Sequence, residues 1–293
     1  MNTLVDIGLN GGALGCAYAL IALAFVVTYK ATGVLNLAQG GIMLVGAYTT
    51  YSAHQQWHLP FWLAMVTGVA AGAFAGWLIQ AAVLRFMIGR GFFAQILVTF
   101  GLLYIMVEIG TATWGSESLD LGTPWGNSTV RIAGASIPEY RIWTIVLTAI
   151  AVLAFFVFFK FSRLGLSMRA TAFDQEAALA QGISPRRVYA VSWAVSGAVA
   201  ALSAIMLTAN PGGLDPSLQA QALLAFPAII LGGMDSPGGA VLAGLVVGVT
   251  QNLAAQYLQI GSGFSAVFPY VVMLAVLLIR PYGIFGTPEV RRI

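Results

Sequence analysis

The chain of 293 residues is 59% hydrophobic and only 8% charged, whereas soluble domains contain about 25% charged residues. So few charged residues cannot cover the water-exposed surface of a soluble protein of this length. We therefore predict an integral membrane protein and expect no nucleic-acid partner. The single cysteine, Cys16, lies inside the first apolar run, which excludes disulfides and cysteine-based metal sites.

Apolar runs of roughly twenty residues, the length of a spanning helix, follow one another along the whole chain. The first has no preceding basic stretch or small-residue cleavage site, so we expect it to be retained as a span rather than removed as a signal peptide. One run is short and carries Pro227, so a re-entrant or broken helix competes there with a full span. The runs are 7–29, 34–53, 59–84, 93–114, 142–159, 188–209, 221–234, 240–258 and 264–279.

These runs predict an all-α, polytopic membrane protein with about eight to nine transmembrane helices, in one transmembrane domain covering 1–293. The basic residues give the orientation, because cytoplasmic loops are enriched in lysine and arginine. If every run crosses, only Arg131 and Arg141 lie on one side, which predicts an N-terminus outside and a cytoplasmic C-terminus. The other side holds Lys30, Arg85, Arg90, Lys160, Arg163, Arg169, Arg186, Arg187, Arg280, Arg291 and Arg292.

The outer connection, 115–141, contains turn residues and short alternating runs, which predict a small hairpin. If 221–234 only dips into the membrane, Arg280 and the residues after it change sides. His54 and His58 are four residues apart, as two metal ligands on a helix would be. The sequence shows no third ligand near this interface loop, so we predict no metal site there.

The inner connection, 160–187, reads as a short capped helix. Thr171 is the expected N-cap, with Asp174 three residues later able to reach back to it. Gly182 is expected at the C′ position, with Ile183 making the hydrophobic contact of that cap. A helix of roughly ten residues is marginal alone in water. It therefore either rests on lipid headgroups or docks on a partner, and composition does not decide between the two.

The second apolar run begins with two amides and paired glycines, Asn36, Gln39 and Gly40-Gly41. One interpretation is that Asn36 only caps a helix at the cytoplasmic interface. The other is an irregular helix start, buried in protein beside a translocation path, where non-helical backbone is tolerated. The broken segment at Pro227 could then supply a matching irregularity across the path.

Two further polar positions lie within apolar runs. Glu108, in the outer part of its run, is a functional-site hypothesis by default, or a side chain that reaches the outer interface beside Trp114. Gln251 and Asn252 either hydrogen-bond between helices or line a path. Asn36, Gln39, Glu108, Pro227 and Asn252 are therefore the candidate path residues.

The inner connection resembles a known motif. Glu176, Ala177 and Ala178, followed after three residues by Gly182, are similar to the EAA-x-x-x-G core of the coupling loop in bacterial ABC import permeases. The distal Ile-x-Leu-Pro part of that motif is absent. The wider chain resembles permeases of the branched-chain amino-acid type and their urea and amide relatives, although that family often has His at position 39 and an acidic residue near Gly41. The matching blocks are "GVLNLAQGGIMLVGAY", "RATAFDQEAALAQGIS" and "FPAIILGGMDSPGGAVLAGLVVGV" followed by "IRPYGIFGTPEV".

The resemblance implies an ABC importer permease fold in a bacterial inner membrane. It also implies a second homologous permease chain, identical or different, two cytoplasmic ATP-binding subunits and an extracytoplasmic solute-binding protein. No G-x-x-x-x-G-K-[ST] sequence occurs in the chain, so ATP would be bound by the partner subunits and no cofactor is expected here. The 171–182 helix would be where the ATPase pushes.

The solute implied by the family is a branched-chain or other hydrophobic amino acid, with urea or an amide as the alternative. A self-sufficient secondary transporter is the rival function, and it would need ion-coupling carboxylates at mid-membrane, for which only Glu108 is a candidate. An intramembrane enzyme would need a nucleophile with a base, or a metal set. The sequence indicates neither, so no catalytic residue is predicted.

Overall fold

The computed structural model describes residues 2–87, 89–125, 128–132, 135–209, 213–257 and 264–286. Over these residues the chain is helical almost throughout, with one two-stranded sheet. Six helices are long and apolar enough to cross a membrane, which confirms the predicted all-α, multi-pass membrane fold. These helices are α1 (Asn2–Thr32), α3 (Phe61–Ala82), α4 (Phe92–Trp114), α5 (Glu139–Phe161), α8 (Pro185–Leu207) and α11 (Pro237–Tyr257).

Shorter elements follow each of the six long helices, and the one after α11 is a further apolar helix. They are α2 (Gln39–Tyr51), the π-helix η1 (Ser52–Gln56), the 3-10 helix η2 (Leu84–Phe86), the strands β1 (Thr129–Ile132) and β2 (Ala135–Pro138), α6 (Arg163–Phe173), α7 (Gln175–Ala180), the 3-10 helix η3 (Pro216–Ala220), α9 (Gln221–Leu224), α10 (Phe226–Gly232) and α12 (Phe264–Ile279).

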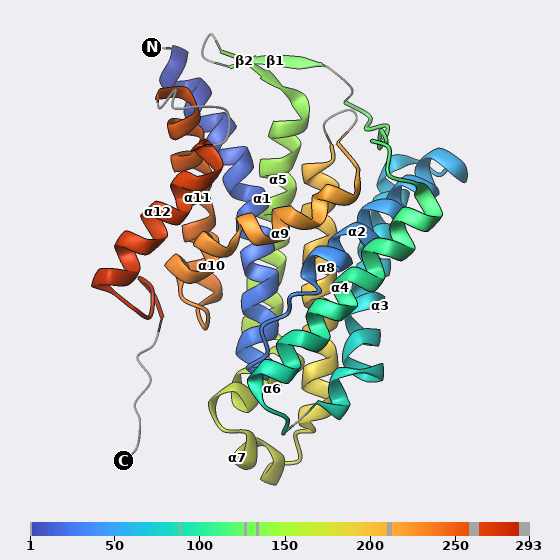
Figure 1. The fold of residues 1–293 in the computed structure, drawn as a ribbon, viewed down its shortest axis with the longest axis vertical. Helices are drawn as coiled ribbons and strands as arrows, with labels where there is room; N and C mark the ends of the chain where they lie inside the picture. Colours follow the sequence, from blue (N-terminus) through green and yellow to red (C-terminus); the bar gives the residue numbers. More distant parts are fainter. Residues whose placement is uncertain are drawn as a thin grey trace.

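The long helices run along one axis, with the β1–β2 hairpin at one end and α6 and α7 at the other (Figure 1). We call these the hairpin end and the α7 end. The strands pair antiparallel from Thr129↔Pro138 to Ile132↔Ala135, so the predicted hairpin is present. His54 links η1 to the connection between α4 and β1. Its two ring nitrogens lie 2.7 Å from the Leu59 carbonyl oxygen and 2.8 Å from that of Gly122.

The described basic residues separate between the two ends. Arg131 lies in β1 and Arg141 near the start of α5, both at the hairpin end. The predicted charge asymmetry is therefore present in the fold, while the end that faces the cytoplasm stays a prediction. Arg280 directly follows α12, and Arg291 and Arg292 lie outside the described residues. The basic residues at the α7 end are Lys30, Arg85, Arg90, Lys160, Arg163, Arg169, Arg186 and Arg187.

The short run that carries Pro227 is broken into three helical pieces, η3, α9 and α10. Just before η3, Leu214 forms a β-bridge with Leu119 in the connection that leads to the hairpin. Just after α10, the Asp235 carbonyl oxygen accepts a hydrogen bond of 2.9 Å from Lys30 Nζ at the α7 end of α1. The segment therefore extends between the two ends of the bundle instead of turning back.

Helix α1 forms the centre of the bundle. Every side chain from Ala17 to Val27 is at most 2% exposed, as expected for a helix that is apolar on all sides. Around it, glycines allow helix backbones to come close, which is how membrane helices pack without a hydrophobic driving force. A Cβ added at Gly15 would lie 2.8 Å from Leu245 Cα of α11.

The same device joins α3 to α8. A Cβ added at Gly72 would lie 2.5 Å from Ala201 Cβ and 2.6 Å from the Gly197 carbonyl oxygen. Both contacts are closer than real Cβ atoms show, and one of them is to backbone, so the two helices would have to separate.

We predict that Gly72→Ala lowers the free energy of unfolding by about 1–3 kcal/mol, since overpacking forces the backbone apart. Gly101→Ala on α4 is the matched control, because no atom lies within 4 Å of the added Cβ. That variant should be unchanged or up to about 1 kcal/mol more stable, because alanine favours a helix. Thermal unfolding in detergent measures both, and equal stability of the two variants would contradict this packing.

Candidate functional site

The chain is not helical between α1 and α2. Residues 33–38 form bends and turns, beginning at Gly33 with a φ of +69°. This break is buried, because Asn36, Ala38 and Gln39 are 0% exposed. The irregular start predicted for the second apolar run is thus present. The alternative in which Asn36 caps the helix is wrong, because Ala38 is the N-cap residue and no side chain caps it.

The two amides of the break bond to each other. Asn36 Nδ2 donates to Gln39 Oε1 at 2.6 Å, and Gln39 Nε2 reaches the Ser196 carbonyl oxygen on α8 at 3.4 Å. Ser196 Oγ donates to the Ala24 carbonyl oxygen of α1 at 2.7 Å and lies 3.3 Å from Gln39 Oε1. We call Asn36, Gln39 and Ser196 the amide network. It connects α1, the break, α2 and α8.

One atom of this network has no partner. Asn36 Oδ1 is buried and accepts no hydrogen bond from the described residues. Buried polar groups are nearly always hydrogen-bonded, so an exception needs an explanation. This oxygen can accept a hydrogen bond from a donor that reaches the break, such as a water molecule or another small molecule.

The backbone of the break is held by a side chain from another helix. Thr99 Oγ1 on α4 accepts a hydrogen bond of 3.2 Å from the Leu37 amide. The same hydroxyl donates to the Ile96 carbonyl oxygen at 2.9 Å. Backbone groups inside a membrane must find partners within the protein, and Thr99 supplies one where the helix does not.

The break also lies against the broken segment after α8. A Cβ added at Gly40 would lie 2.6 Å from the Gln219 carbonyl oxygen of η3, so the start of α2 and η3 approach backbone to backbone. The two irregular segments therefore meet, through Gln219 rather than through Pro227. Pro227 is buried in the first turn of α10.

The structure does not bring the other candidate path residues to this network. Glu108 is exposed on α4, near Tyr104 and Ile109, which are 53% and 59% exposed. Asn252 is half-buried on α11. A Cβ added at Gly11 of α1 would lie 3.1 Å from the Asn252 Cβ. Asn252 thus lies at a helix contact, as one of the two readings expected.

The α6–α7 turn differs from the predicted single helix. Thr171 is not an N-cap: it lies inside α6 and is buried. The N-cap of α7 is Asp174, whose Oδ1 accepts a hydrogen bond of 2.9 Å from the Ala177 amide. The reason is that Asp174 is extended, with φ −153° and ψ 108°, whereas the backbone of Thr171 is helical and cannot turn its hydroxyl toward the next turn.

The C-terminus of α7 has the predicted cap. Gly182 has a φ of +80°, its amide donates to the Leu179 carbonyl oxygen at 2.9 Å, and the Ile183 amide donates to that of Ala178 at 3.0 Å. These are the two hydrogen bonds of a Schellman motif. Ala178 is buried, whereas Glu176 and Ala177 are exposed, so α7 turns one face to the protein and the other away.

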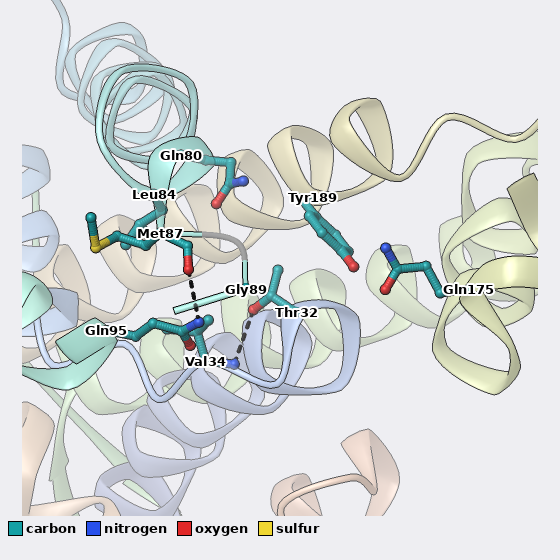
Figure 2. Close-up of a pocket in the computed structure, with 9 residues that line it drawn as sticks. All are labelled: Thr32, Val34, Gln80, Leu84, Met87, Gly89, Gln95, Gln175 and Tyr189. Carbon is teal, nitrogen blue, oxygen red and sulfur yellow. Dashed lines mark hydrogen bonds between the residues drawn. The ribbon is translucent and has the colours of Figure 1, made fainter. Parts of the chain in front are cut away.

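A cavity of about 170 Å³ lies between α7 and the bundle (Figure 2). In Figure 2 the Tyr189 hydroxyl and the Gln175 amide face each other across it, and the Gln80 amide points into it. Among the residues that line it are Thr32 of α1, Gln80 of α3, Leu84 of η2, Gln95 of α4, Gln175 of α7 and Tyr189 of α8.

Three partners of these sites were not found from sequence. Ser196, Thr99 and Gln219 lie far along the chain from the break, and hydroxyl or amide residues in apolar runs are too common to single out. The one local signal is Asp215-Pro216, because Asp215 Oδ1 caps η3 through the Ser217 amide at 2.7 Å and so marks a helix start.

The chain was compared with known proteins. The family described as "Branched-chain amino acid transport system / permease component" matches residues 8–277. The high-affinity branched-chain amino acid transport system permease protein LivH of Escherichia coli (strain K12) is 30% identical over 300 residues, covering 97% of this chain and 96% of that protein. The LivM permease protein of the same strain is 27% identical, covering 91% of this chain and 67% of that protein.

Among solved structures, PsaBC from Streptococcus pneumoniae in complex with Fab has a TM-score of 0.49 and 14% identity, covering 91% of this chain and 89% of that chain.

The amide network predicts unequal effects of removing its two amides. Gln39→Leu leaves the buried Asn36 amide without its acceptor, so we expect the free energy of unfolding to fall by about 1–3 kcal/mol. Asn36→Leu should have a smaller effect, because Gln39 keeps Ser196 and an unpartnered oxygen is removed. The double variant should lose less than the sum of both. Unfolding in detergent measures this, and strict additivity would argue against the network.

Proposed function

This chain belongs to the family of branched-chain amino acid transport system permease components, and we propose on that premise that it is the membrane-spanning subunit of an ATP-driven importer. The family match covers residues 8–277, which is nearly all of the bundle. The chain is a transport subunit, and ATP hydrolysis is assigned to separate subunits, in keeping with the missing phosphate-binding loop.

The proposed solute is a branched-chain or other hydrophobic amino acid, delivered by an external binding protein. The names of the relatives LivH and LivM support this class of solute. The amide network carries hydrogen-bonding groups and no charge, which suits a zwitterionic or neutral solute better than an ion. Urea or a small amide is the alternative within the same class of importer.

The proposed assembly contains a second permease chain and two cytoplasmic ATP-binding subunits. This chain is similar to both LivH and LivM of one organism. That double similarity supports a pair of related chains, identical or different. The exposed surface of α4, on which Glu108 lies, is large enough to face a neighbouring chain as well as lipid, because only 11% of its span is buried.

The observation that carries the proposal is the exposed surface of α6 and α7. Phe173 is 95% exposed and Leu179 61% exposed, and neither lies in a candidate span. Large apolar side chains exposed outside the membrane mark an interaction site. We assign this surface to the ATP-binding subunit. The α7 end is then cytoplasmic and the hairpin end faces outward, in a bacterial inner membrane, with the N-terminus outside.

Helix α8 joins this docking surface to the amide network. It begins at Pro185, directly after the α7 cap, and carries Ser196. The distance between the two along the helix axis is about 16 Å, at roughly 1.5 Å per residue. A displacement of α7 would therefore be carried to Gln39 by a rigid element. We propose that the break before α2 opens in this way to pass the solute.

We predict that the double variant Phe173→Ser/Leu179→Ser folds as the wild type does but loses ATP-subunit binding and transport. Both side chains are exposed, so their removal leaves no cavity. Co-purification with the ATP-binding subunits and uptake in vesicles measure the loss, which we expect to be at least about tenfold.

The matched control is Phe161→Ser, since Phe161 is 74% exposed at the same end but belongs to the α5 span. This variant should keep ATP-subunit binding. If instead the α6–α7 double variant assembles and transports normally, α7 rests on lipid headgroups and the coupling role is refuted.

A further inference from the structure

Polar side chains from α3, α7 and α8 meet at the cavity behind α7. Gln80 is 4% exposed and Tyr189 is 8% exposed, and both line the cavity together with Gln175. The described residues supply no hydrogen bond to any of the three side chains, whereas Thr32 donates to the Thr28 carbonyl oxygen at 2.7 Å. Gln175 is otherwise exposed, and the polar atoms of the three side chains are accessible from the cavity, so a molecule bound there can form hydrogen bonds with them.

The lining defines the charge of what fits. No lysine, arginine, histidine, aspartate or glutamate is among the described residues that line the cavity. An ion entering it would lose hydration without gaining an opposite charge, which is strongly unfavourable. An uncharged occupant therefore fits this lining best.

The lining also defines the hydrogen bonding of the occupant. The Gln80 and Gln175 amides each offer donors and an acceptor, and the Tyr189 hydroxyl can do either. In Figure 2 these groups converge from α3, α7 and α8 on one space. A molecule that carries both a donor and an acceptor can satisfy groups on opposite walls at once.

The size is that of a very small molecule. The cavity volume is about 170 Å³, close to the roughly 150 Å³ of an apolar cavity known to bind benzene. About five or six non-hydrogen atoms fit such a space. Val34, Leu84 and Met87 supply an apolar part of the wall, which suits a ligand with a short hydrocarbon part.

We propose that this cavity is a binding site for a small uncharged molecule with both donor and acceptor groups, of which a primary amide is the simplest example. Such a ligand bridges Gln175 of α7 to Gln80 and Tyr189 and so fixes α7 against the bundle. Its binding does not depend on the transport role of the chain, because the site is formed by residues outside the amide network.

The test uses the purified full-length chain in detergent and ligand-observed NMR titrations. The probes are propionamide, propionate and propylammonium, which are similar in size and differ in charge. Propionamide should bind saturably with a dissociation constant of about 1 mM, as expected for a ligand of this size. Propionate and propylammonium should give no saturable signal.

Variants locate the site. Tyr189→Phe and Gln80→Met keep the shapes of the side chains and remove hydrogen-bonding groups, so each should weaken propionamide binding about fivefold. Tyr104→Phe removes the same hydroxyl from an exposed tyrosine of α4 and should change nothing. Should Gln80→Met not fold, Tyr189→Phe alone decides.

The proposal is overturned by any of three results. Absence of saturable propionamide binding means that the cavity holds water only. Equal binding by wild type and Tyr189→Phe places the ligand elsewhere. Propionate binding as tight as propionamide contradicts the inferred selection for an uncharged molecule.

Discussion

A helix that stops inside a membrane must find partners for its backbone within the protein, because hydrocarbon supplies none. In this chain that constraint applies at residues 33–38, between α1 and α2. Thr99 of α4 accepts a hydrogen bond from the Leu37 amide. Asn36 donates to Gln39, which in turn donates to the Ser196 carbonyl oxygen of α8. The positions of α1, α4 and α8 around the break follow from this need.

The close packing of the bundle also holds these helices in place around the break. Glycines bring α3 against α8 and α1 against α11, so that α1 is buried at the centre and α8 is fixed beside it. Ser203 Oγ adds a second link between α8 and α1, donating to the Ala17 carbonyl oxygen at 3.1 Å. The result is a closely packed frame around the break at 33–38, where we propose that the conformational change of transport takes place.

Local signals in the sequence predict much of this fold. Apolar runs predict the spans, Pro227 predicts a broken segment, and Gly182 predicts the end of α7 because only an αL residue makes that cap easily. The predicted start of α7 at Thr171 is wrong. Threonine and aspartate both favour the N-cap position, and tertiary packing, which buries Thr171 in α6, decides between Thr171 and Asp174.

The partners of the break could not be predicted in the same way. Gln39 and Ser196 are separated by 157 residues, and no periodicity relates them. The amides could be identified as unusual for an apolar run, but the residues that satisfy them depend on which helices become neighbours. The same holds for the contact of Gly40 with Gln219.

The central claim is that the amide network acts in transport and does not only hold the helices together. The direct measurement is solute uptake by the reconstituted complex, normalised to assembled protein, for Gln39→Leu beside Ser203→Ala. Ser203→Ala removes a buried hydrogen bond between α8 and α1, outside the amide network, so it reports the effect of lost stability alone. We expect normalised uptake to fall about tenfold or more in Gln39→Leu while assembly and basal ATP hydrolysis persist, and to be unchanged in Ser203→Ala. Unchanged normalised uptake in Gln39→Leu would contradict the account and leave the network a purely structural one.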